Sequence, residues 1–173
     1  NEFRIAYPAR LRRAAGFMRA WGLQSKRRLG DQTTTYVTRL PAGDARAHDL
    51  VGVIVPFDAL ARLRPELRRG LVAVPFGGET FDWLGWTDPP AALREVHVAV
   101  MKVERMAPPC AAMPILQSHL DLIVEAALRH GAAFAAEWLE QIQWWTVTET
   151  AGAATCAAEE SGVPPTRTAC YFL

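Results

Sequence analysis

The sequence contains little of what marks a secreted, membrane-spanning or metal-binding protein. Three cysteines (Cys110, Cys156 and Cys170) are too few and too scattered among 173 residues for a disulfide framework or a zinc site. No apolar run approaches the roughly 18–20 residues that cross a bilayer, and no apolar leader is visible near Asn1. We therefore expect a protein of the reduced cytoplasm, without a membrane span or a bound metal.

Common catalytic and cofactor-binding motifs are also missing. The sequence contains no GxGxxG, GxxxxGKS/T, HExxH or GxSxG pattern. The usual signs of dinucleotide, nucleotide, metalloprotease and serine-hydrolase sites are therefore absent. The four histidines show no ligand spacing, and His97 and His119 are expected to be packed or surface residues.

The composition is that of one folded domain with an uneven charge distribution. Hydrophobic residues make up 50% of the chain, which excludes a mostly disordered protein. Residues 1–30 hold eight basic residues and one acid, a net charge of +7, whereas the whole chain has a net charge of +1. Such a basic end fits a solvated face, an anionic surface, an acidic ligand or a nucleic acid. No recognition-helix pattern or interleaved aromatic platform accompanies it, so nucleic acid is the least favoured partner.

The order of predicted elements indicates the fold class. Strands are expected at 16–21, 33–40, 50–57, 71–76 and 95–103, a short helix at 59–67, a loop at 77–90, and helices from Pro114 to 130 and from Ala132 to about 143. Strands followed by a helix pair favour an α+β domain with a mostly antiparallel or mixed sheet. The sequence after Trp145 has little periodicity, so we predict a domain at 1–145 and a loose tail at 146–173.

One carboxylate and two tryptophans are candidate functional residues. Glu66 lies between the predicted helix and the next strand, and neighbouring arginines such as Arg64 and Arg68 would keep it ionised. The same pattern also suits a helical ion-pair cluster at the surface. Trp83 and Trp86 lie in the predicted loop at 77–90, where large rings require either core packing or a ligand.

The helix pair carries the most distinctive pattern of residues in the chain. Residues 114–121 read Pro-Ile-Leu-Gln-Ser-His-Leu-Asp, and an Ala-Phe-Ala run surrounds Phe134. This resembles the closing helix pair of the γ-glutamylcyclotransferase-like family, with His119 where the family has Tyr. The segments 7–21, 50–57 and 96–100 are more loosely similar to strands of that family. The resemblance covers roughly residues 5–140 and implies a small mixed, curled sheet or barrel with a C-terminal helix pair.

The resemblance also implies a reaction that needs no cofactor. Enzymes of this family release 5-oxoproline from γ-glutamyl amino acids or peptides, because the substrate's α-amine attacks its own γ-amide carbonyl. A Glu takes the proton from the α-ammonium group as general base. In this chain the resemblance implies Glu66 as the base, Arg64 and Arg68 as binders of the substrate carboxylates, and Trp83 and Trp86 as a wall of the pocket.

Two features depart from the family pattern. The family's Tyr-Gly-Ser-Leu loop has no counterpart here, since Asn1 falls where the chain would leave that loop. Alignment on Gly70 puts Arg68 at the position of the catalytic Glu, so that Glu66 lies two residues early. Two other function classes therefore stay open. One is a non-catalytic relative that binds a small acidic ligand or a protein partner, and the other is a binder of nucleic acid or anionic surfaces through residues 1–30.

Overall fold

The computed structural model describes residues 6–25, 31–56, 70–85, 88–101, 106–143 and 170–172. Within these ranges most of the strands come before two helices, so the predicted α+β class is confirmed. The helix predicted at 59–67 lies outside the described residues. No helix in the described ranges is both long and apolar enough to cross a membrane.

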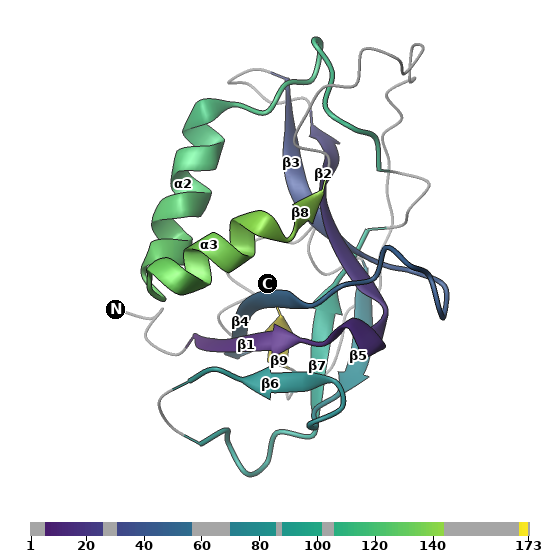
Figure 1. Cartoon of the computed structure of the whole chain (residues 1–173), viewed down its shortest axis with the longest axis vertical. Coiled ribbons are helices and arrows are strands. Elements are labelled where there is room, and N and C mark those ends of the chain that lie inside the picture. The colour runs from purple at the N-terminus through teal and green to yellow at the C-terminus, as the bar shows by residue number, and fades with distance from the viewer. Residues whose placement is uncertain are drawn as a thin grey trace.

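Six of the described strands form a mixed sheet, which occupies the lower half of the view in Figure 1. Their spatial order is β5-β7-β9-β4-β1-β6. Their bounds are β1 Tyr7–Leu11, β4 Leu50–Pro56, β5 Leu71–Pro75, β6 Phe81–Trp83, β7 Glu95–Ala99 and β9 Cys170–Phe172. The pairing of β7 with β9 is parallel, and the other pairs are antiparallel.

The strand β4 lies inside this sheet, as its apolar character on both faces predicts. Leu50 and Ile54 of β4 are at most 1% exposed and belong to the main core cluster. Leu11 of β1 and Val96 of β7 are fully buried in the same cluster. Burial of these apolar side chains is the main force that holds the sheet together.

The second sheet has the order β3-β2-β8 and consists of β2 Phe17–Ser25, β3 Gln32–Arg39 and β8 Ile142–Gln143. The β2–β3 pair is antiparallel, with an irregularity between Trp21 and Leu23, and β8 runs parallel to β2. The threonine-rich strand β3 has buried side chains because its outer edge is covered. Thr33 donates its N–H to Pro114 O at 2.8 Å and its hydroxyl to Met113 O at 2.6 Å.

The two helices are α2 Gln117–Leu128 and α3 Ala132–Glu140, and Figure 1 shows them together on one side of the molecule. The predicted helix pair is therefore confirmed. The prediction that Pro114 opens the first helix is wrong, because Pro114 O is occupied by β3 and the helix begins three residues later. Gly131 separates the helices at φ +105°, a conformation that glycine adopts without the penalty of a side chain.

Two other expectations need correction. The predicted loop at 77–90 contains the short strand β6, which pairs with β1 through Phe81–Trp83. In the predicted tail at 146–173, Cys170–Phe172 form β9 between β4 and β7, so these three residues are not loose. Neither segment shows the alternation of apolar and polar residues that predicts a strand. Each is a strand because it pairs with a longer strand of the sheet. The described strands also form two sheets that close no barrel.

Candidate functional site

The structure describes one of the five residues that the sequence predicts for the site. Outside the described ranges lie Glu66, Arg64, Arg68 and Trp86. Their predicted roles as base, carboxylate binders and pocket wall therefore stay predictions.

Trp83 lies in β6 and is partly buried against the core. Its ring centroid lies 5.1 Å from that of Tyr7 and 6.1 Å from that of Phe76, which in turn stacks on Phe81 at 5.5 Å. Ring pairs at these distances are typical of aromatic packing. Packing accounts for the position of Trp83, and its predicted contact with a ligand stays a prediction.

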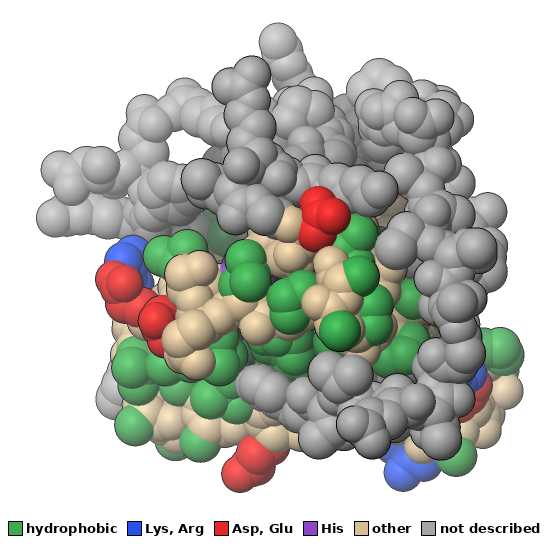
Figure 2. All heavy atoms as spheres, turned by 90° about the horizontal axis from the view of Figure 1, so that it is seen from above, with side chains coloured by type: hydrophobic (Ala, Val, Ile, Leu, Met, Phe, Trp, Pro, Cys, Tyr) green, Lys and Arg blue, Asp and Glu red, His purple; other side chains and the backbone are tan. Residues whose placement is uncertain are grey.

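The described arginines of the basic N-terminal region do not form one surface. Arg12 pairs with Asp82, Arg10 pairs with Glu137, and Arg19 is buried, whereas Arg13 is exposed. On the face drawn in Figure 2, the basic side chains that are described lie at the periphery rather than in a patch. A broad electrostatic footprint, which binding to a nucleic acid requires, is therefore not found among the described residues.

Arg19 is the most unusual side chain of the described residues. It lies in β2 and is 2% exposed. Its Nη1 donates a hydrogen bond to Val51 O of β4 at 3.0 Å, and its guanidinium carbon lies 4.6 Å from the centroid of the Trp138 ring of α3. No carboxylate of the described residues pairs with it. Among the described residues, Arg19 is thus a buried cation held by one carbonyl and one aromatic face.

Burial without a counter-charge perturbs the guanidinium strongly. Desolvation lowers the pKa of Arg19 well below its usual range, to about 9, and no carboxylate of the described residues opposes this effect. A free arginine has five N–H donors and stays charged at neutral pH. Within the described part of the chain, Arg19 is therefore a cation without the anion that usually accompanies a buried charge.

The helices cover the face of β2 that carries Arg19. Trp21, two residues further along the strand, is fully buried, and its ring meets His119 of α2 at 6.1 Å in an edge-on arrangement. Arg19 and Trp21 share a face because side chains two residues apart in a strand point the same way. This contact supports the prediction that His119 is a packed residue.

An ion-pair network lies next to Arg19. Arg10 of β1 donates Nε and Nη2 to the two carboxylate oxygens of Glu137 in α3, both at 2.8 Å. The hydrogen bond with Glu137 is the main cause of the raised pKa of Arg10, and attraction by the same carboxylate adds to it. Two parallel bonds of this kind fix the orientation of both partners.

Glutamine 141 connects this network to the strand that holds Arg19. Its Nε2 donates to Glu137 Oε1 at 3.0 Å, and its Oε1 accepts the N–H of Val51 at 2.6 Å. Val51 is therefore bonded twice by side chains, at its N–H by Gln141 and at its carbonyl by Arg19. On β4, the described strand β9 pairs with Ile54–Pro56 and does not reach Val51, so these side chains take the place of a neighbouring strand there.

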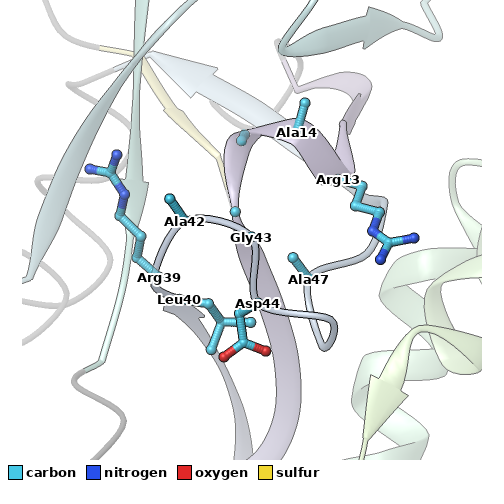
Figure 3. A pocket seen from close by; sticks show the side chains of 10 residues that line it. Arg13, Ala14, Arg39, Leu40, Ala42, Gly43, Asp44 and Ala47 are labelled. Carbon is cyan, nitrogen blue, oxygen red and sulfur yellow. The ribbon is translucent and has the colours of Figure 1, made fainter.

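A separate hollow of about 480 Å³ lies between the turn at 41–44 and the short 3-10 helix Arg13–Ala15. Figure 3 shows that the guanidinium groups of Arg13 and Arg39 point away from it in different directions. Asp44, which also lines the hollow, pairs with Arg46, and this hydrogen bond lowers the pKa of Asp44 to about 2. The charged groups of this hollow do not converge, so it is a weaker candidate than the region of Arg19.

No family model, curated protein or solved structure matches the chain. Among the described residues, no group of three or more histidine, cysteine, aspartate and glutamate side chains is arranged to hold a metal ion.

In the sequence, Arg19 is one of eight basic residues in the first thirty positions. The alternation in β2 contains a more specific signal, because Phe17, Arg19 and Trp21 occupy every second position. An arginine between two large aromatic residues on one face of a strand is expected to point into an apolar interior. The identity of its cover, Trp138, could not be read from the sequence, because 119 positions separate the two residues.

Proposed function

We propose that the protein binds a small acidic molecule through Arg19, and that γ-glutamyl compounds are the class of molecule it takes. The observation that carries the proposal is the buried guanidinium of Arg19, which no described carboxylate neutralises. The sequence resemblance of the helix pair to γ-glutamylcyclotransferase-like proteins supports the choice of ligand class.

Physical chemistry favours an anion at this position. Burial of an unpaired charge costs several kcal/mol, and natural proteins accept such costs mostly at functional positions. The Trp138 ring lies over one face of the guanidinium, whereas the N–H groups project in its plane. In the proposed complex, a ligand carboxylate accepts two parallel hydrogen bonds from these N–H groups while the ring contact persists. Charge neutralisation would return much of the cost of burial.

Cyclisation of a γ-glutamyl group is compatible with this anchor. The α-amine forms a bond to the γ-carbonyl carbon, the bond from that carbon to the leaving amine breaks, and the leaving amine takes up a proton. The α-carboxylate does not react and is present in both the substrate and 5-oxoproline. Arg19 could hold that group throughout, with Glu66 as the general base that the sequence predicts.

A non-catalytic protein that only binds the acid is the second candidate, because the base rests on the sequence alone. Two measurements on the purified protein separate the candidates. The first is calorimetric titration with glutarate, a dicarboxylate that has no amine and cannot cyclise. The second is release of 5-oxoproline from γ-glutamylalanine and from glutathione.

The expected result is glutarate binding by the wild-type protein, loss of binding in Arg19→Met, and unchanged binding in the exposed control Arg13→Met. If the wild-type protein releases 5-oxoproline and Glu66→Gln does not, the protein is a cyclotransferase. If the wild-type protein binds glutarate but releases no 5-oxoproline, it is a non-catalytic binding protein. Absence of glutarate and γ-glutamylalanine binding by the wild-type protein would overturn the proposal.

A further inference from the structure

We propose that Arg10, Glu137 and Gln141, here called the α3 clamp, position Arg19 and Trp138 for the ligand without touching the ligand themselves. This inference rests on the proposed function, because it concerns the same site. Its central member is Glu137, whose carboxylate bonds to both other members of the clamp.

Among the described residues, the polar contacts of the clamp tie the C-terminal part of α3 to β1 and β4, in addition to the packing of the helix against α2 and β4. The helix has nine residues, and only Ala135 among them is buried. No side chain caps its N-terminus, where Gly131 occupies the cap position. Polar contacts of defined geometry therefore add to the apolar packing that positions this helix. The bidentate bond between Arg10 and Glu137 is the strongest contact of this kind.

Glu137 is adjacent in sequence to Trp138, whose ring covers Arg19. A rotation or shift of α3 by a fraction of a turn would therefore move this ring away from the guanidinium. The cation–π attraction requires the cation to lie over the ring within about 6 Å of its centroid. The clamp thus determines the position of the Trp138 ring over Arg19.

Gln141 determines the position of the second contact of Arg19, the carbonyl group of Val51. The Glu137 carboxylate can only accept hydrogen bonds, so it holds the Nε2 of Gln141 and turns the amide oxygen toward the Val51 N–H. The carbonyl of Val51 is the acceptor for Arg19. Arg19 is thus connected to Glu137 through both of its contacts, by way of Trp138 and by way of Val51 and Gln141.

Glu137→Gln is the informative substitution because it keeps the size of the side chain. A glutamine at this position can both donate and accept, so it no longer dictates the orientation of the Gln141 amide. It also removes the charge that aligns Arg10. We expect glutarate and γ-glutamylalanine to bind on the order of tenfold more weakly, as is typical when outer-shell partners of a bound group are removed.

The matched control is Glu125→Gln in α2. Glu125 pairs with Arg129 at 3.0 Å, but this pair is exposed and lies four residues apart on one helix. It should leave ligand affinity unchanged, because exposed pairs of this kind contribute little. Arg10→Lys provides a second test. It keeps the charge but loses the two-point contact with Glu137, and it should weaken binding in the same direction as Glu137→Gln.

The measurement is calorimetric affinity at a temperature where urea unfolding shows every variant to be folded. A merely structural clamp would change the unfolding midpoint of Glu137→Gln and Arg10→Lys and leave their affinities equal to that of the wild-type protein. That result would overturn the positioning role while the proposed function stood. If the wild-type protein bound neither ligand, the proposed function itself would fail.

Discussion

The substitution Arg19→Met tests the central observation directly, because it removes the buried charge and keeps a long apolar side chain. In a protein whose arginine is paired with a buried carboxylate, removal of the arginine costs about 3–5 kcal/mol. Arg19 has no such partner among the described residues, so we expect a different outcome in the ligand-free protein. The substitution should leave the free energy of unfolding unchanged or increase it.

The expected magnitude follows from the contacts of Arg19. Burial lowers its pKa well below the usual range, to about 9, a shift worth about 5 kcal/mol against the folded state at neutral pH. Loss of the hydrogen bond to Val51 O would cost about 1–3 kcal/mol, since that carbonyl would remain unsatisfied. Loss of the contact with Trp138 would cost a further amount of about 1–2 kcal/mol. The net effect is a stabilisation of about 0–3 kcal/mol, which is the balance of these terms.

Equilibrium urea unfolding near 25 °C, followed by circular dichroism, measures this free energy. Arg13→Met serves as the control for loss of one positive charge at an exposed position, and it should change stability by less than about 0.5 kcal/mol. A loss of about 3 kcal/mol or more in Arg19→Met would refute the reasoning, because it would reveal an ion-pair partner. Saturating glutarate should stabilise the wild-type protein by about 2–3 kcal/mol at a hundredfold excess over Kd, and it should not stabilise Arg19→Met.

Three further predictions concern pH and packing. Because burial lowers the pKa of Arg19, the free-energy cost of burying its charge is fully present below about pH 9 and decreases as pH rises through that value. Urea unfolding at increasing pH should therefore show the stability of the wild-type protein approaching that of Arg19→Met. An unchanged difference up to about pH 10 would contradict the assignment of that pKa. Partial burial also lowers the pKa of His130, whose ring lies 5.1 Å from that of Phe134 in a tilted arrangement. Its protonation therefore opposes folding as pH falls through its unfolded value, and His130→Gln should lose less stability in mild acid than the wild-type protein does. Gly70→Ala would bring a methyl group against the Val100 carbonyl oxygen, so calorimetric melting should show a loss of about 1–3 kcal/mol, whereas Gly78→Ala, with open space around it, should show little change.

Local patterns in the sequence were sufficient for the α+β class, for most of the strands and for the helix pair. Alternating and β-branched residues predict strands because successive side chains of a strand face opposite sides, and the apolar run at Leu50–Pro56 predicts a strand buried on both faces. These features depend on neighbours in the chain. The same patterns missed β6 and β9, which have three residues each and exist because longer strands present them with an edge.

The candidate site was decided by tertiary structure. The sequence places Arg19 within a basic region that looks like one charged surface, and the fold divides that region between ion pairs, solvent and the interior. Whether an arginine is solvated or buried depends on what lies against it. For Arg19 this is Val51 of a distant strand and Trp138 of a helix near the other end of the described chain. Composition and spacing determine which groups are available, but charge, burial and partner depend on contacts between residues far apart in sequence, and only the folded chain brings these together.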